Sequence, residues 1–161
     1  MTVRRRRAAR VILLDEADRV LLFHGFDPAE PALTWWFTPG GGLEPGEGPR
    51  EAALRELAEE TGLTTVRLGP VVALDRACFS YDGEQYEQEQ SFLLARTPTD
   101  GTQDGLDCSG SPADEQPQLR EARWWTAAEL RASTETIYPV RLAELVEQLV
   151  AQGPPVVPVR L

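Results

Sequence analysis

The chain has few of the residues that build disulfide frameworks or sulfur-rich metal sites. Its 161 residues include two cysteines, Cys78 and Cys108, which match no disulfide framework and no ligand cluster. We therefore expect both thiols to be free. The single histidine, His24, begins a stretch from His24 to Thr34 that carries two prolines and is typical of a loop. We expect it to be an incidental surface residue.

Long apolar runs and an excess of positive charge are also missing. No run approaches membrane-spanning length and no apolar signal-peptide core is present, so we expect a cytoplasmic protein without a membrane partner. Sixteen basic residues against 26 acidic ones give a formal net charge of −10, which argues against general nucleic-acid binding. The one basic cluster, Arg4 to Arg7, has no interleaved aromatics. We expect residues 1–7 to form a solvated, partly disordered lead-in.

The most informative stretch combines a glycine-rich turn with a helix. Proline and glycine residues between Pro39 and Gly46 interrupt any periodic pattern, so residues 40–46 are expected to form a loop. Pro49 suits a first helical turn, and Gly62 stands where a terminating glycine is common. The residues between them are strong helix formers. We therefore predict a helix from Pro49 to Thr61.

This helix gathers carboxylates on one side. At about 100° per residue, Glu56, Glu59 and Glu60 fall within an arc of about 100°, with small and apolar residues on the other side: Ala53, Leu54, Leu57 and Ala58. Crowded carboxylates repel one another unless a cation lies among them, and a hard divalent ion is the natural candidate. An acidic face that simply meets solvent is the alternative. The residues alone leave both interpretations open.

The same segment resembles the Nudix box, G-x5-E-x7-R-E-U-x-E-E-x-G-U, in which U is a bulky aliphatic residue. It matches at every fixed position: Gly41, Glu47, Arg55, Glu56, Leu57, Glu59, Glu60, Gly62 and Leu63. The flanking sequences WWFTPGG and EARWWTAAEL also look like those of Nudix proteins. Nine fixed positions in so short a span are far more specific than a lone glycine motif. The resemblance therefore favours the metal site over the solvated face.

The resemblance implies a hydrolase of diphosphate linkages that uses Mg²⁺ or Mn²⁺. Glu56, Glu59 and Glu60 would be the metal ligands, and which of them accepts the proton of the attacking water is left open. A bound cation would lower the pKa of a water molecule, neutralise the diphosphate and orient it. It would also mask the repulsion between an acidic protein and a phosphorylated substrate.

Other box residues are implied to support this site. Arg55 would form an ion pair with Glu47 that braces the loop against the helix, and its guanidinium would orient a ligating carboxylate. Glu47 is expected to support structure more than chemistry. The glycines Gly40, Gly41 and Gly42 would let the loop backbone approach metal or phosphate closely.

A further catalytic carboxylate often comes from outside the box in this family. Glu115, shortly before EARWW, is the first candidate and Glu89 the second, although solvated surface is the alternative for both. Glu87 shares the strand face of Glu89. Several aromatic residues could stack on a base, although packing in the core or at its rim is the simpler expectation for them: Trp35, Trp36, Phe79, Tyr81 and Tyr86.

We expect a single domain spanning residues 1–161, of the α/β class, with a mixed sheet flanked by helices. The resemblance implies that this is an α/β/α sandwich. Strands are predicted at Arg10 to Leu14, Arg19 to Phe23, Trp35 to Thr38, Val66 to Leu74, Ala77 to Tyr81, Gln85 to Arg96 and Arg123 to Thr126. Further helices are predicted at Ala127 to Ala132 and Tyr138 to Gln152. Residues 97–119 read as a long polar loop and residues 153–161 as an extended tail.

The expected substrate is a small molecule, a nucleoside diphosphate linked to another moiety or another diphosphate compound. Sugar nucleotides, dinucleoside polyphosphates and noncanonical nucleoside triphosphates are not separated by the sequence. The alternative is a ligand sensor of the same fold that binds a nucleotide without turnover, although no box carboxylate has been lost. Homodimerisation is a further expectation from the resemblance.

Overall fold

The computed structural model describes residues 2–98 and 118–161. The predictions about Glu115 and Cys108, and most of the predicted long loop, lie outside these residues. No helix within the two described ranges is long and apolar enough to cross a bilayer.

The described residues form one mixed sheet with three helices. The strands are β1 (Val3–Leu14), β2 (Val20–Asp27), β3 (Glu30–Phe37), β4 (Gly40–Gly42), β5 (Arg67–Tyr81), β6 (Glu84–Arg96), β7 (Gln118–Trp125), β8 (Ile137–Tyr138) and β9 (Val159–Arg160). The helices are α1 (Pro49–Thr61), α2 (Ala127–Ala132) and α3 (Leu142–Gln152). The strand order is β8-β3-β2-β1-β6-β5-β9, with β4 paired to β1 and β7 to β2.

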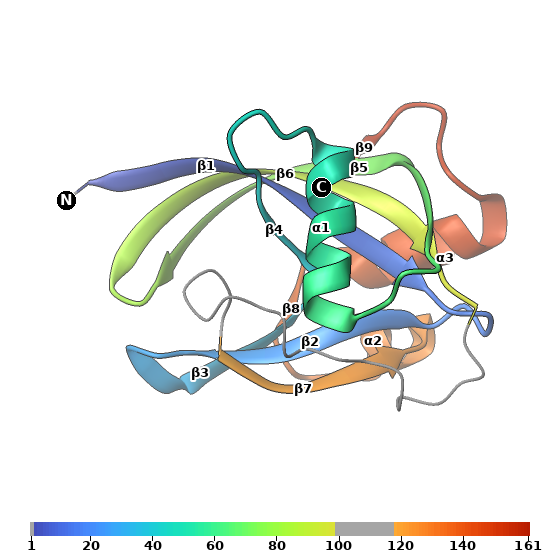
Figure 1. The fold of residues 1–161 in the computed structure, drawn as a ribbon. Coiled ribbons are helices and arrows are strands. Elements are labelled where there is room, and N and C mark those ends of the chain that lie inside the picture. The colour runs from blue at the N-terminus through green and yellow to red at the C-terminus, as the bar shows by residue number, and fades with distance from the viewer. Residues whose placement is uncertain (1, 99–117) are drawn as a thin grey trace.

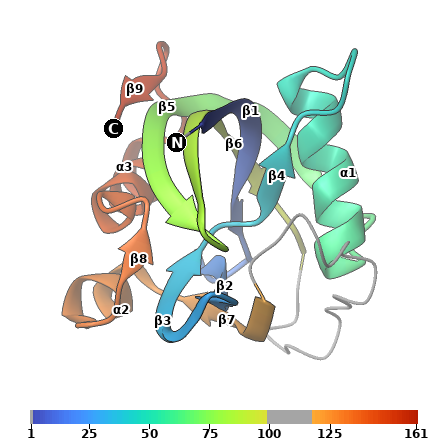
Figure 2. The same cartoon turned by 90° about the vertical axis from the view of Figure 1, so that its left-hand side faces the viewer.

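The sheet bends into two wings where β1 meets β2. These two strands pair only at Leu14 and Val20, whereas β1 runs parallel to β6 over its whole length, from Val3 to Leu14. One wing therefore holds β1, β5 and β6, and the other holds β2, β3 and β7 (Figures 1 and 2). The short strand β4 follows β3 and returns to the first wing.

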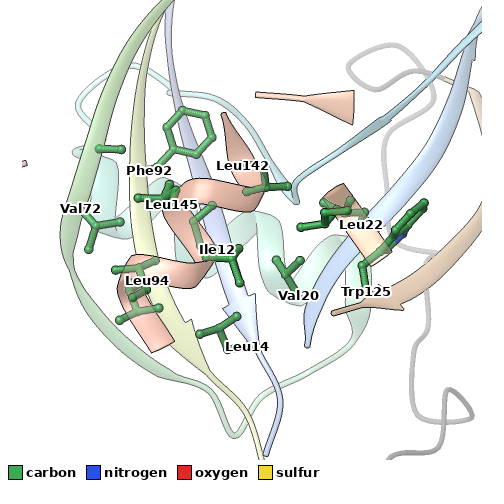
Figure 3. Close-up of a cluster of buried hydrophobic side chains, with 14 of the residues drawn as sticks. Ile12, Leu14, Val20, Leu22, Val72, Phe92, Leu94, Trp125, Leu142 and Leu145 are labelled. Carbon is green, nitrogen blue, oxygen red and sulfur yellow. The ribbon is translucent and has the colours of Figure 1, made fainter. Parts of the chain in front are cut away.

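Helices cover both faces of this sheet. Figure 2 shows α1 on one side and α3 on the other, with β1, β5 and β6 between them. Alternate residues of β1 point to opposite faces of the sheet. Val11 and Leu13 pack with Leu57 of α1. Ile12 and Leu14 belong to the cluster that contains Leu142 and Leu145 of α3 (Figure 3). Each such buried side chain contributes about 1.5–3 kcal/mol. The predicted α/β/α sandwich is confirmed.

Helix α1 has the bounds predicted from the sequence. It begins at Pro49 after Gly48, which provides no side-chain cap, and ends at Gly62. Gly62 adopts a left-handed φ of 70° and donates its N–H to the carbonyl of Ala58. Glycine reaches that conformation without a steric penalty, so it ends the helix where the sequence suggested.

The basic lead-in is a correction. Arg4 to Arg7 lie within β1, paired with residues 86–89 of β6. Their side chains find partners on the neighbouring strand, which gives the segment a reason to be ordered: Arg4 with Glu84, Arg5 with Glu87 and Arg6 with Gln88. The cluster is therefore part of an ordered strand of the sheet and not a disordered tail.

The expected loop from His24 to Thr34 is also wrong. Strands β2 and β3 form a hairpin across it, and only residues 28 and 29 separate them. The Asp27 carboxylate accepts the N–H of Ala29 and so stabilises the turn. His24, expected at the surface, stacks on Trp36 with ring centroids 4.4 Å apart, and its side chain is only 15% exposed.

Other element boundaries shift because of long-range pairing. Strand β5 is continuous where two strands were predicted, since residues 67–81 pair with one long partner, β6. The predicted loop at residues 40–46 contains β4, and Tyr138 belongs to β8, so the last helix begins at Leu142. The helix α2 and the extended tail agree with the predictions, and Asp82 and Gly83, both with positive φ, form the turn between β5 and β6. Cys78 is a free, exposed thiol, as expected.

Candidate active site

The candidate site lies where α1 faces the junction of β1 and β4. Glu56 and Glu60 are fully buried, whereas the side chain of Glu59 is 31% exposed. The sequence predicted that the glutamates and the apolar residues lie on opposite sides of the helix. In the structure, Leu54 is about half exposed, and Glu56 and Glu60 lie on the inward side with Ala53 and Leu57. The acidic side therefore faces the protein, where carboxylates require partners.

Glu60 has one satisfied and one unsatisfied oxygen. Its Oε1 accepts the backbone N–H of Gly40 at 2.7 Å, and its Oε2 is buried without a hydrogen-bond partner in the described part of the chain. Burial, with the neighbouring charge of Glu56, raises the pKa of Glu60 well above its usual value. A buried oxygen without a hydrogen-bond partner, such as Oε2 of Glu60, would be stabilised by a positively charged group beside it.

Glu56 and Glu59 are joined by one guanidinium. Nη1 of Arg55 lies 3.1 Å from Oε1 of Glu56 and 3.4 Å from Oε2 of Glu59. Burial raises the pKa of Glu56, and the charge and hydrogen bond of Arg55 oppose that rise. Arg55 therefore supplies part of the positive charge that these carboxylates need.

The ion pair expected between Arg55 and Glu47 is present. Nε and Nη2 of Arg55 donate to the two carboxylate oxygens of Glu47 at 2.8 and 2.9 Å, and Nη2 also donates to the carbonyl of Gly42 at 3.0 Å. These hydrogen bonds lower the pKa of Glu47 to about 2 and raise that of Arg55. A two-pronged contact of this kind fixes both direction and distance, so Arg55 ties the loop to the helix.

The three box glutamates offer the ligand atoms that a hard cation prefers, but their side chains do not converge on one point. Within residues 2–98 and 118–161, no three acidic, histidine or cysteine side chains converge as a ready ligand set. Nη1 of Arg55 lies between Glu56 and Glu59 instead. The donors are nevertheless carboxylate oxygens, one of them, Oε2 of Glu60, buried and without a partner. Such a donor set suits Mg²⁺ or Mn²⁺.

Gly40 allows the loop to lie directly against β1. Its φ is +138°, and a Cβ at this position would lie 2.1 Å from the carbonyl oxygen of Ala9 and 2.7 Å from Cα of Arg10. No side chain fits so close to backbone atoms. The absence of a side chain therefore brings the Gly40 N–H within reach of Glu60, whereas the approach of the loop to metal or phosphate stays a prediction.

Arg10 is a site neighbour that sequence reasoning missed. Its Nη1 donates to the carbonyls of Thr38 at 3.4 Å and Gly40 at 3.1 Å. Burial lowers its pKa to about 10, and the negative charge of Glu60 opposes this shift. The sequence carries one signal of this role, because Arg10 is the charged member of the otherwise apolar run Arg10 to Leu14.

The second candidate for an additional carboxylate does not join this cluster. Glu89 lies exposed on β6 and lines a separate cleft of about 320 Å³ together with Arg7 and Arg76. None of the three α1 glutamates lines that cleft. Glu87, on the same face of β6, pairs with Arg5 and Arg76.

The aromatic candidates divide into core and rim. Trp36 is buried between His24 and Trp125, so it belongs to the core. Phe79 and Tyr86 stack on each other with centroids 5.2 Å apart. The remaining pair, Trp35 and Tyr81, makes an edge contact that joins the two wings.

The chain is similar to known proteins in both sequence and fold. The sequence model of the NUDIX domain matches residues 4–148. The chain is 38% identical over 117 residues to an RNA pyrophosphohydrolase of Roseobacter denitrificans, covering 66% of this chain and 67% of that protein. It is 33% identical over 103 residues to a putative 8-oxo-dGTP diphosphatase of Bacillus subtilis, covering 63% and 61%. A crystal structure of a MutT protein from Methanosarcina mazei has the same fold, with a TM-score of 0.59, 16% identity and coverage of 93% and 96%.

Proposed function

Because this chain belongs to the Nudix hydrolase family, we propose that it hydrolyses the diphosphate bond of a nucleoside diphosphate linked to another moiety. The observation that carries the proposal is the buried pair Glu56 and Glu60 on α1, with Oε2 of Glu60 lacking a partner beside the glycine loop. A buried acidic pair of this kind destabilises the folded protein unless a positively charged group lies beside it.

The proposed cofactor is Mg²⁺, with Mn²⁺ as a substitute. Hydrolases of this family generally use divalent metals, and Glu56, Glu59 and Glu60 are the residues proposed to hold one here. When bound, such an ion activates water and neutralises charge on a diphosphate. Of these residues, Glu60 is held by the Gly40 N–H and Glu59 lies at the more exposed edge. We leave open which glutamate accepts the proton of the water.

Arg55 and Glu47 are proposed to orient the reacting groups and not to react themselves. Arg55 contacts Glu47, Glu56, Glu59 and the carbonyl of Gly42 at once. Its guanidinium therefore fixes the loop and two of the proposed ligands in one geometry. Loss of such support around a metal site typically costs 10–100-fold in affinity or activity.

The names of the relatives support a nucleoside-containing substrate. An RNA pyrophosphohydrolase and a putative 8-oxo-dGTP diphosphatase both act on phosphate chains attached to nucleosides. We propose the same chemistry for this chain. The net charge of −10 would repel such a substrate unless cations intervene, which agrees with the proposed metal.

A panel of substrates tests the proposal. Purified protein is incubated with a 5′-triphosphorylated RNA oligonucleotide, 8-oxo-dGTP, a dinucleoside polyphosphate and a sugar nucleotide, each with Mg²⁺ or EDTA. We expect phosphate-bearing products from at least one substrate, with Mg²⁺ only. Glu60→Gln should remove the activity, whereas Glu51→Gln, an exposed change on the same helix, should leave it intact.

The sensor alternative predicts a different result from the same panel. A nucleotide would bind tightly by calorimetry, no substrate would be cleaved, and Glu60→Gln would change neither outcome. That combination would overturn the proposed hydrolase. Cleavage that continues unchanged in EDTA would keep the hydrolase but overturn the proposed metal.

A further inference from the structure

We infer that Arg10 is a positioning residue of this site, which holds the loop from Thr38 to Gly40 so that one oxygen of Glu60 is fixed and the other is left for the cation. The inference rests on the proposed function and adds a residue outside the box. Arg10 reaches the loop from the facing strand, β1, where it pairs with Gly40 in the antiparallel register. It therefore acts through Glu60 and not on a substrate.

The carbonyls of the loop are held from one side. Those of Thr38 and Gly40 accept hydrogen bonds from Nη1 of Arg10, and that of Pro39 accepts the N–H of Val11 at 2.8 Å. Adjacent residues of β1 thus restrain three successive carbonyls. With these directions set, the N–H of Gly40 points at Glu60 and donates to Oε1 at 2.7 Å.

The loop depends on hydrogen bonds from another element, because its own glycine residues have no side chains that could restrain the backbone. Residues 40–42 are all glycine and carry no side chain that could hold the backbone. Glycine gains more conformational freedom than any other residue when it is released. At Gly40 the required φ of +138° and the close contact with Ala9 forbid a side chain. The restraint must therefore come from β1, which supplies it through the backbone N–H of Val11 and the side chain of Arg10.

Arg10 is itself held in place by a polar network on β6 and β5. Its Nε donates to Oε1 of Gln90 at 3.2 Å, and the same oxygen accepts Nε2 of Gln88 at 2.9 Å. Gln90 in turn donates to Asp75 at 3.3 Å. Gln88 is only 1% exposed, whereas Gln90 and Asp75 are partly buried and line the cleft beside β6. A guanidinium is suited to the task because its planar fork can donate in two directions at once.

The charge of Arg10 matches its position as well. Its guanidinium acts on both Glu60 and Glu56, and each carboxylate favours the protonated form of Arg10. Arg10 and Arg55 thus approach the two buried acids from different elements, β1 and α1. Arg55 contacts the proposed ligands Glu56 and Glu59 directly, whereas the side chain of Arg10 donates hydrogen bonds to backbone carbonyls and to Gln90.

Binding of Mn²⁺ and steady-state kinetics test the inference together. The variants are Arg10→Gln, Arg10→Lys and Gln90→Ala, with Arg5→Gln as a matched loss of one exposed arginine from the same strand. Mn²⁺ affinity is measured by electron paramagnetic resonance without substrate. We expect Arg10→Gln to weaken Mn²⁺ binding about 10–100-fold and to lower kcat similarly, with KM changed less than about twofold.

The two other variants separate geometry from charge. Arg10→Lys keeps the positive charge but lacks the fork, so we expect a partial loss of Mn²⁺ affinity. Gln90→Ala removes one restraint on Arg10 and should give a smaller loss that is not additive with Arg10→Gln, because both act on one network. Arg5→Gln should match the wild type. Circular dichroism confirms that each variant is folded, and if Arg10→Gln is not, the lysine and Gln90 variants decide the question.

Distinct outcomes overturn the inference and the proposed function. Wild-type Mn²⁺ affinity and kcat in Arg10→Gln, or in both Arg10→Lys and Gln90→Ala, would overturn the positioning role. A raised KM with unchanged kcat would overturn it in favour of a direct substrate contact. If the wild type binds no Mn²⁺, or if Glu60→Gln binds Mn²⁺ as the wild type does, the proposed metal site fails instead.

Discussion

Replacing Glu60 by glutamine should stabilise the metal-free protein while abolishing its activity. The side chain of Glu60 is fully buried, and burial together with the charge of Glu56 raises its pKa well above the usual value. A carboxylate whose pKa is raised by folding weakens the fold once the pH exceeds its pKa in the unfolded chain. Glutamine keeps an acceptor for the Gly40 N–H and presents an amide N–H₂ in place of the unsatisfied oxygen.

The direction of the pH dependence follows from linkage. Because the pKa of Glu60 is raised, wild-type stability should fall as the pH rises above the ordinary carboxyl value of 4.5, and the glutamine variant should lack this fall. A buried polar atom without a partner costs about 1–3 kcal/mol, and Oε2 of Glu60 is such an atom in the described part of the chain. We expect a gain of at least about 1 kcal/mol at pH 8, which is a Tm increase of roughly 2–4 °C for a domain of this size.

Unfolding in urea with EDTA, at pH 5 and pH 8, measures the gain. Mn²⁺ should then reverse the order of stability, because a ligand at 100 times its Kd adds about 2.7 kcal/mol to the wild type and nothing to a variant that does not bind it. Glu51→Gln, exposed on the same helix, should change neither value. A Glu60→Gln protein less stable than wild type in EDTA at pH 8, or equally stabilised by Mn²⁺, would refute the reasoning.

Three further substitutions probe the surrounding contacts. Arg55→Ala should lower kcat about 10–100-fold because the loop and two glutamates lose their common partner, with an unchanged circular dichroism spectrum; full activity or an unfolded protein would contradict this. Glu47→Gln should reduce the loss of stability that the wild type shows in thermal melts as the pH falls from about 4.5 to about 2. The lowered pKa of Glu47 makes its carboxylate stabilise the fold fully only above this window, so an unchanged pH dependence would count against the ion pair. Gly40→Ala should lower the free energy of unfolding in urea by about 1–3 kcal/mol or more, because the new side chain would strain the backbone and overlap with β1. Gly46→Ala should lower it less, because Gly46 has a φ of +80° but open space around it. Equal losses in the two variants would argue against the close contact at Gly40.

Helix α1 could be read from the sequence because its boundaries are set locally. Pro49 favours only the start of a helix, and Gly62 adopts the left-handed conformation that ends it. Neither effect needs a tertiary partner. The inward orientation of Glu56 and Glu60 could not be derived in this way, since it depends on where the helix lands on the sheet.

The strands were less predictable because their limits depend on distant partners. Residues 3–9 became a strand through pairing with β6, more than seventy residues away in the chain. His24 and Trp36 lie opposite each other across the hairpin of β2 and β3, in a stretch whose prolines suggested a loop. Composition describes a residue and its neighbours, whereas sheet pairing is decided by the register of another segment.

In the candidate site, too, contacts between residues close in the sequence could be predicted, and contacts between distant segments could not. Arg55 and Glu47 could be matched because the box fixes their spacing, and the ion pair between them spans one loop and two turns of helix. Arg10 belongs to another element, and its relation to Gly40 appears only when β1 and β4 are paired. An isolated arginine at the start of an apolar strand was the one available signal, and it carried no information about its partner.

The present arrangement of Arg55 explains why the proposed ligands are not yet a ready cation site. Its Nη1 occupies the space between Glu56 and Glu59, where it offsets part of their repulsion. A divalent ion would add positive charge beside carboxylates whose repulsion Arg55 offsets only in part, and Glu56, Glu59 and Glu60 are the residues that would hold it. The contact of Arg55 with Glu47 uses Nε and Nη2, which leaves Nη1 for Glu56 and Glu59. One guanidinium can therefore hold the loop and orient two of the proposed ligands at once, which a lysine with one nitrogen could not do.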